Sequence, residues 1–183
     1  MAIKTFTTGE LLTASDTNTY LANSGLVWIK SETVGSGVTS VPVTGAFSNT
    51  YDNYKITYTG GVGGSSQYLV ITLGSAVTNY FGSMFGAAYA SNAYIGIGVN
   101  AGASFPYVGI CTTSYTMFDC DLYGPNLARS TLINAKWTFN LSGIGYSVFN
   151  GEQASNTQFT SFTVSSAAAL TGGTINVYGY RKP

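Results

Sequence analysis

Two acidic residues separated by one position are the first candidates for chemistry in this chain. Asp119 and Asp121 flank Cys120, and side chains two positions apart on a β-strand lie on the same face. Such a pair could hold a hard cation such as Ca²⁺ with loop carbonyls, but calcium sites usually gather three or more oxygen-rich side chains. A glycosidase pair would need an apolar cleft around one carboxyl group, and the sequence shows no such cleft. We favour a solvated strand face on which the aspartates pair with Arg129 or Lys136.

The lack of histidine narrows the function classes further. The 183 residues include no histidine, seven basic and seven acidic residues. Neither a Ser-His-Asp or Cys-His catalytic unit nor the usual histidine-based zinc site can be built from them. A nucleic-acid groove is not expected either, because phosphate binding relies on Lys and Arg. We therefore expect no enzymatic activity, no cofactor, no bound metal and no nucleic-acid partner.

Three weaker signals are interpreted structurally. The glycine-rich segment 96–102 has the wrong spacing for a dinucleotide fingerprint and no helix pattern follows it. Cys111 and Cys120 are expected to be reduced and buried, with a disulfide as the less favoured alternative. The first residues lack the apolar stretch of a signal peptide, and polar residues interrupt every apolar run. We therefore expect no membrane insertion.

From Leu26 onward the chain has the pattern of short β-strands. Apolar and polar residues alternate between turn signals spaced 8–12 residues apart, as in sandwiches and barrels. The best alternating face consists of Ile133, Ala135, Trp137 and Phe139, and we expect Ile144, Tyr146 and Val148 to face it across a turn at Ser142-Gly143. Residues 81–102 could form a loop, a bulged strand or an intersubunit surface. The predicted fold is all-β, an antiparallel β-sandwich, jelly-roll-like, of about ten strands.

Residues 1–25 have a different character. Thr13 and Asp16 have the spacing of a capping box, which predicts a short helix from Ala14 to Ala22. Gly25 would supply a left-handed cap at its end. Such a helix is too short to be stable alone in water, so it must dock onto another surface. We therefore divide the chain into an N-terminal arm, residues 1–25, and a β-sandwich head, residues 26–183.

The arm carries a resemblance to a known group of proteins. Residues 6–18, FTTGELLTASDTN, resemble the F-x-x-G-E-x-L-T-A-x-D-x-N entry segment of tailed-bacteriophage fibre and virion structural proteins, of the fibre or head-decoration type. Residues 47–54 and 172–181 resemble pieces of the β-rich heads in that group, whereas residues 75–130 match poorly. The resemblance implies a virion surface component, usually trimeric, attached through its N-terminal segment. The anchoring residues that it implies are Phe6, Gly9, Glu10, Leu11, Leu12, Asp16, Asn18, Tyr20 and Leu21.

The distribution of charge points independently to contacts between subunits. No charged residue lies between Lys55 and Asp119, a gap of 63 residues. Interface cores are depleted of charge and enriched in aromatic residues, so residues 56–118 are expected to contribute to the core and to subunit contacts. Most of the 14 tyrosines are expected in the core. Tyr89, Tyr94 and Tyr107 are expected near loops, where they would bind glycans or another subunit.

These observations lead to one principal expectation and two alternatives. We expect a non-enzymatic phage virion protein, a homotrimeric fibre or spike on the particle surface. Residues 1–25 would bind a capsid or tail protein, and the head would contact host surface glycans. One alternative is a capsid decoration protein that stabilises the head lattice. The other is a free carbohydrate-binding module, which would have no use for an anchoring arm.

Overall fold

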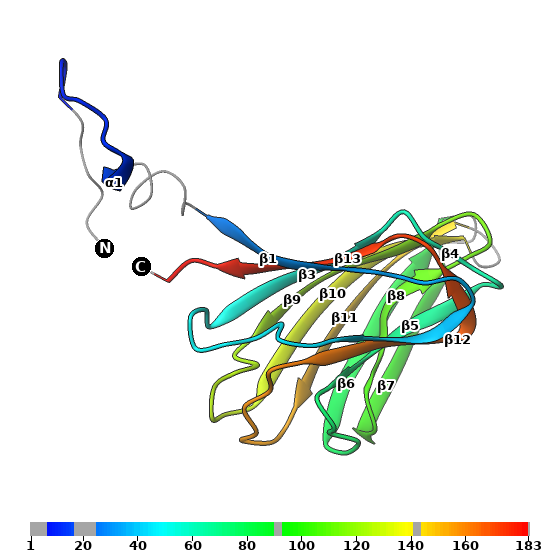
Figure 1. The fold of residues 1–183 in the computed structure, drawn as a ribbon. Helices are drawn as coiled ribbons and strands as arrows, with labels where there is room; N and C mark the ends of the chain where they lie inside the picture. Colours follow the sequence, from blue (N-terminus) through cyan, green and yellow to red (C-terminus); the bar gives the residue numbers. More distant parts are fainter. Residues whose placement is uncertain (1–6, 17–24, 90–92, 141–143, 183) are drawn as a thin grey trace.

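The computed structural model describes residues 7–16, 25–89, 93–140 and 144–182, and nearly all of its regular structure is β (Figure 1). One short helix, α1 (Ala14–Asp16), lies in the arm. The strands are β1 (Leu26–Thr33), β2 (Val38–Val43), β3 (Asn53–Thr59), β4 (Val62–Gly63), β5 (Gln67–Leu73), β6 (Tyr80–Ala88), β7 (Tyr94–Gly102), β8 (Phe105–Cys111), β9 (Thr116–Tyr123), β10 (Thr131–Asn140), β11 (Ile144–Gln153), β12 (Phe162–Thr171) and β13 (Thr174–Tyr180).

The strands form a wide sheet and a narrow sheet that are joined along one pair of strands. The wide sheet has the order β1-β13-β3-β9-β10-β11-β6-β7, and every pairing in it is antiparallel. The narrow sheet has the order β2-β12-β5-β8, also antiparallel, with β4 on β12. The β8–β9 pairing, over Gly109–Cys111 and Thr116–Phe118, connects the two. The all-β, antiparallel sandwich is confirmed, whereas the jelly-roll strand order stays a prediction.

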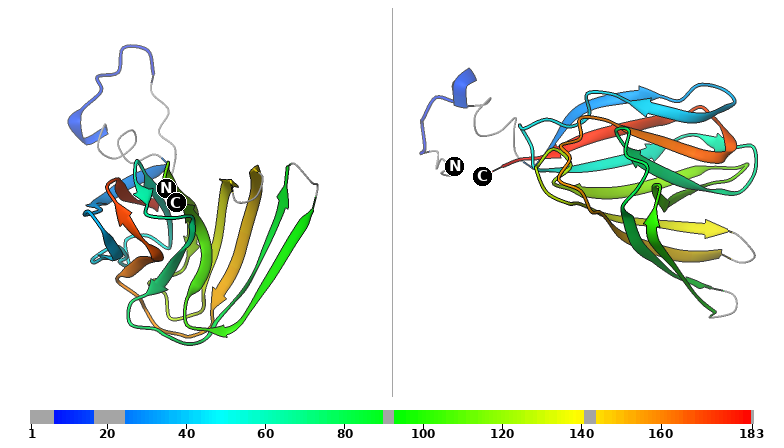
Figure 2. Two further views of the ribbon diagram at one scale, coloured as in Figure 1. Left: turned by 90° about the vertical axis from the view of Figure 1, so that its right-hand side faces the viewer. Right: turned by 90° about the horizontal axis from the view of Figure 1, so that it is seen from below.

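The wide sheet extends beyond the narrow one on one side. Figure 2 (left) shows that β11, β6 and β7 form an extension of the wide sheet, which diverges from the rest of the head. Rings from the narrow sheet contact the inner face of this region. Tyr68 of β5 contacts Trp137 of β10 with ring centroids 6.5 Å apart, and Tyr107 of β8 contacts Phe149 of β11 at 6.2 Å. We call the face of the wide sheet that points away from these rings its outer face.

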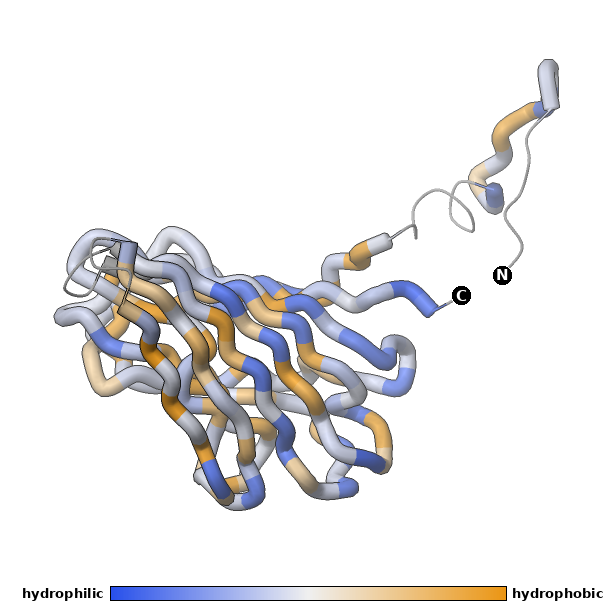
Figure 3. The backbone as a smooth tube through the Cα atoms, turned by 180° about the vertical axis from the view of Figure 1, so that it is seen from behind, coloured by the Kyte–Doolittle hydropathy of each residue, from blue (hydrophilic) through white to orange (hydrophobic). Residues whose placement is uncertain are grey.

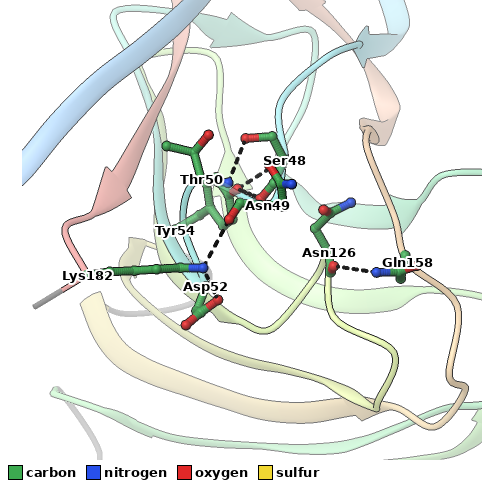
Figure 4. A network of polar contacts seen from close by, with 8 residues as sticks. All are labelled: Ser48, Asn49, Thr50, Asp52, Tyr54, Asn126, Gln158 and Lys182. Carbon is green, nitrogen blue, oxygen red and sulfur yellow. Dashed lines mark hydrogen bonds and ion pairs between the residues drawn. The ribbon is translucent and has the colours of Figure 1, made fainter.

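The buried tyrosines carry hydrogen bonds that hold loops against the core. Most described tyrosines belong to the core, as expected: three are fully buried, Tyr54, Tyr58 and Tyr80, and four half-buried rings pack against the core, Tyr51, Tyr68, Tyr107 and Tyr115. The Tyr54 hydroxyl accepts a bond from the Ser48 backbone N–H and donates one to the Ser48 carbonyl oxygen, each at 2.8 Å (Figure 4). Most other tyrosines lie on sheet surfaces, where an apolar ring with a polar tip can be half-buried.

The β10–β11 hairpin differs from the predicted one in its register. Ile133, Ala135 and Trp137 are buried as expected. Asn140 pairs with Ile144 across a three-residue connection, which places Trp137 opposite Ser147. Tyr146 and Val148 therefore lie on the outer face, and the expectation that they face Trp137 is wrong. A shift of one residue moves every side chain of a strand to the other face. The Ser142-Gly143 turn and the side chains of Phe139 and Ile144 lie outside what the structure describes.

The segment that the sequence left open, residues 81–102, forms β6 and β7. The glycines of β6 are explained by close strand contacts rather than by a loop. A Cβ atom at Gly82 would lie 2.6 Å from the carbonyl oxygen of Asn150, and one at Gly86 would lie 2.8 Å from that of Tyr146. Both glycines therefore let β6 approach β11 closely.

The chain termini of the head lie side by side. The Arg181 backbone N–H donates to the Gly25 carbonyl oxygen at 3.1 Å. The Lys182 ammonium group lies 2.8 Å from Asp52 and donates to the Asn49 carbonyl oxygen at 3.0 Å (Figure 4). The arm therefore leaves the head beside the anchored C-terminal strand. Within the described residues, no helix has the length and apolar character needed to cross a membrane.

Candidate functional site

The arm contains the capping box that the sequence predicted. The Thr13 hydroxyl accepts a bond from the Asp16 backbone N–H at 3.1 Å, and the Asp16 carboxylate accepts one from the Thr13 backbone N–H at 3.2 Å. These reciprocal bonds satisfy two backbone donors at the start of a helix. Gly25 has a φ of 79°, as a left-handed position requires. Residues 17–24, the remainder of the predicted helix, lie outside the described residues, as do the predicted anchoring residues Phe6, Asn18, Tyr20 and Leu21.

All but one of the described anchoring residues are exposed. Leu11 and Leu12 are 83% and 50% exposed, Gly9 and Glu10 are exposed, and Asp16 is half-buried. In Figure 1 the described residues 7–16 of the arm lie apart from the head, and Figure 3 shows a hydrophobic stretch within this segment. Large apolar side chains that are adjacent and exposed are typical of segments that dock onto a partner.

The two aspartates lie on one face, as expected, but their partner is a different residue. Lys55 on β3 lies 2.5 Å from Asp119 and 3.7 Å from Asp121. The Tyr180 hydroxyl donates to Asp121 at 2.5 Å. The expected pairing with Arg129 or Lys136 is therefore wrong, because β3 pairs with β9 and brings Lys55 opposite Asp121. The ammonium group occupies the position between the carboxylates that a cation would need.

This polar cluster is a structural network. Burial alone would lower the pKa of Lys55, but the hydrogen bond from its ammonium group to Asp119 and the charges of Asp121 and Asp119 raise it. Burial and the hydrogen bond to Asp121 raise the pKa of Tyr180. Cys120, which follows Asp119 in sequence, points into the core on the opposite face of β9; its thiol is buried and unbonded, and its pKa is raised well above its ordinary value by burial and by Asp121 and Asp119. Cys111 is also buried and unbonded, as expected. No group of three or more potential ligand side chains occurs within the described ranges.

A second exposed surface lies on the outer face where β9, β10, β11, β6 and β7 run side by side. Thr138, Tyr146, Ala87 and Tyr94 form one row across the paired strands, and Lys136, Val148 and Phe85 form the next. Figure 3 shows apolar and polar residues alternating along the strands of the head. The Phe85 and Tyr94 rings stack with centroids 5.7 Å apart, and they are 53% and 75% exposed. We call the exposed side chains Phe85, Tyr94, Tyr146 and Met117 the aromatic face.

A shallow depression lies beside this aromatic face. It has a volume of about 150 Å³ and is lined by Met117, Asp119, Lys136, Trp137, Thr138 and Tyr146. The surface that the depression exposes is almost wholly apolar. It could therefore contact a sugar mainly by stacking against the apolar face of the ring.

The three tyrosines predicted to be exposed do not lie together. Tyr94 belongs to the aromatic face, and Tyr89 is exposed directly after β6. Tyr107 is half-buried between Tyr68 and Phe149, so the expectation of exposure is wrong for it. Sequence reasoning missed Phe85, Tyr146 and Met117. The signal that could have identified Tyr146 is its place in the alternation of β11, had the connection length been known.

Comparison with known proteins gave no further assignment: no family model, no curated protein and no solved structure matches the chain.

Proposed function

We propose that the chain is a non-enzymatic structural component of the surface of a tailed-phage particle, a fibre or spike that assembles as a homotrimer. Residues 1–25 attach it to a capsid or tail protein. The observation that carries the proposal is the arm: its capping box leads into a helix, and Leu11 and Leu12 are exposed on a segment that lies apart from the head. A segment of this kind gains stability only by burying its leucines against a partner.

The experiment that tests this role is complementation of particles that lack the protein. The full chain should be incorporated, and a chain without residues 1–24 should not, although its head begins at β1 and should remain folded. Substitution of Leu11 and Leu12 by serine is the finer variant, because both side chains are exposed and their loss costs the head nothing. Normal incorporation of both variants would refute the anchoring role.

Contact with host surface glycans is a second proposed activity of the head. The depression beside Tyr146 and the stacked Phe85–Tyr94 pair support it. A glycan array probed with the head should show binding that is lost in Tyr146→Ala. Tyr123→Ala, which removes an exposed tyrosine at the other end of β9, is the matched control. A head that binds no glycan would favour the capsid-decoration role.

A further inference from the structure

One edge of the sandwich lacks the protection that its other long edges have. In the described part of the chain, β1, β2 and β7 each pair with one neighbour only. β1 carries Lys30 and Glu32, and β2 carries Pro42; charges and prolines are the usual means of preventing edge-to-edge association. β7 contains neither a charge nor a proline.

The regular part of this edge is Tyr94–Val99. Over these residues β7 pairs with Ala87–Gly82, and the register shifts only beyond Val99, where Ala101 adopts a φ of 52°. Six residues are the typical length of a strand. On the side away from β6, the backbone N–H and C=O groups of this segment have no strand neighbour among the residues that the structure describes, so they can bond to another extended segment.

The two faces of the edge have different chemical characters. Ile95, Ile97 and Val99 lie half-buried on the inner face, and Tyr94, Gly96 and Gly98 lie on the outer face. A Cβ atom added at Gly96 or Gly98 would have no atom within 4 Å. The outer side of the edge is therefore open, and the inner side presents a row of β-branched residues that only part of the core covers.

We propose that β7 pairs antiparallel with β7 of a second copy of this chain, about a two-fold axis at Ile97. In an antiparallel pair, opposite residues share a face. This register places Ile97 opposite Ile97 of the second copy, Ile95 opposite Val99, and Gly96 opposite Gly98. The wide sheets of the two copies become one sheet, and each aliphatic row is extended by an identical row.

The charge of the edge favours a second copy over another partner. Neither β6 nor β7 carries a charged residue, so a charged partner strand would find no counter-charge here. A second copy offers an equally neutral edge with the same separation of aliphatic and glycine positions. Self-complementary contacts of this kind generate two-fold symmetric pairs. The inference concerns the head alone and does not depend on attachment to a particle.

The test introduces the missing edge charge. Gly98→Lys places a lysine on the edge at a position where the structure has open space, and it should weaken pairing at least about tenfold. Ser83→Lys is the matched control, because Ser83 is exposed, lies opposite Gly98 on the same face and is one strand further in. Light scattering on the full chain should give an even multiple of 19.2 kDa for the wild type and Ser83→Lys, and half that mass for Gly98→Lys. With the proposed homotrimer, two trimers joined through β7 give six copies, and Gly98→Lys leaves single trimers.

Cross-linking tests the register. A residue on the two-fold axis faces itself, so Ile97→Cys should form a disulfide-linked pair on mild oxidation. Val99→Cys, two positions away from the axis, should not. The native thiols of Cys111 and Cys120 are buried and do not interfere. Four results would each overturn the proposal. Three concern mass: a wild-type monomer, a wild-type mass that Gly98→Lys leaves unchanged, and a three-copy assembly that Gly98→Lys separates. The fourth is cross-linking through Val99→Cys in preference to Ile97→Cys.

Discussion

At the scale of single residues, the hydroxyl groups of buried tyrosines connect the core to its loops. The Tyr80 hydroxyl accepts a bond from the Leu73 backbone N–H at 2.8 Å and donates one to the Ala76 carbonyl oxygen at 3.2 Å. Tyr80→Phe keeps the ring contact with Phe105, at 4.8 Å, but leaves a buried N–H without its partner. We expect the free energy of unfolding to fall by about 1–3 kcal/mol. Urea denaturation measures it, with the exposed-site variant Tyr94→Phe as control.

The polar cluster should make stability depend on alkaline pH. The folded chain holds the protons of Tyr180 and Lys55 more tightly than the unfolded chain, because both pKa values are raised. Their contribution is therefore complete below the ordinary pKa values of about 10 and is lost as pH rises above them.

Denaturation between neutral pH and pH of about 11 should show this decline. Tyr180→Phe should make it shallower while lowering the stability at neutral pH by about 1 kcal/mol or less, because the cluster is only partly buried. An equal decline in wild type and Tyr180→Phe would contradict the assignment.

The same cluster shows what a sequence can reveal about a site. The two-residue period of a strand is enough to predict that Asp119 and Asp121 share a face. Their partner could not be predicted, because Lys55 is 64 positions away from Asp119 and reaches it only through the β3–β9 pairing. Lys136 is nearer in sequence and is the cross-strand neighbour of Asp119 on β10. The ion pair with Asp119 is nevertheless formed by Lys55.

At the scale of elements, the junction between the two sheets depends on a glycine. A Cβ atom at Gly109 of β8 would clash with the Cβ of Phe118 and lie 2.6 Å from the Met117 carbonyl oxygen on β9. Gly109→Ala should therefore destabilise the head by more than about 2 kcal/mol. Gly96→Ala, at an open position without a positive φ, should leave the stability unchanged or raise it by up to about 1 kcal/mol. Thermal unfolding of the two variants measures this difference in stability. A Gly109→Ala variant as stable as Gly96→Ala would mean that β8 can shift away from β9 without cost.

Element positions were predicted well wherever a strand has one buried and one solvated face. Ile133, Ala135 and Trp137 of β10 are buried as their alternation indicated. The prediction failed where the two-residue alternation of apolar and polar side chains does not decide the structure. Residues 81–102 were left open among a loop, a bulged strand and an intersubunit surface, because glycines that serve close packing in β6 look like loop glycines in the sequence. The outer position of Tyr146 was missed because it depends on the number of residues in a connection.

At the scale of the whole molecule, composition predicted the class of fold but not the order of its strands. That order joins segments far apart in sequence, such as β11 with β6 and β12 with β5. The charge-free stretch 56–118 illustrates the consequence. It supplies the buried strands β5 and β8, as expected. It also supplies β6 and β7 at one end of the wide sheet, whose side chains are partly exposed. A lack of charge therefore marks both the core and a neutral edge.

The arm and the β7 edge should act independently, because they belong to different parts of the molecule. Removal of residues 1–24 should abolish attachment to particles and leave the mass of the self-associated head unchanged apart from the deleted residues. Gly98→Lys should halve that mass and leave a head whose arm still binds. Its attachment should nevertheless weaken by about a hundredfold if several arms bind one particle at once, because multivalent attachment multiplies single affinities. Binding of both variants to purified particles, measured at equal chain concentration, separates the effects, and loss of self-association on removal of the arm would show that the arm itself forms the contact between copies.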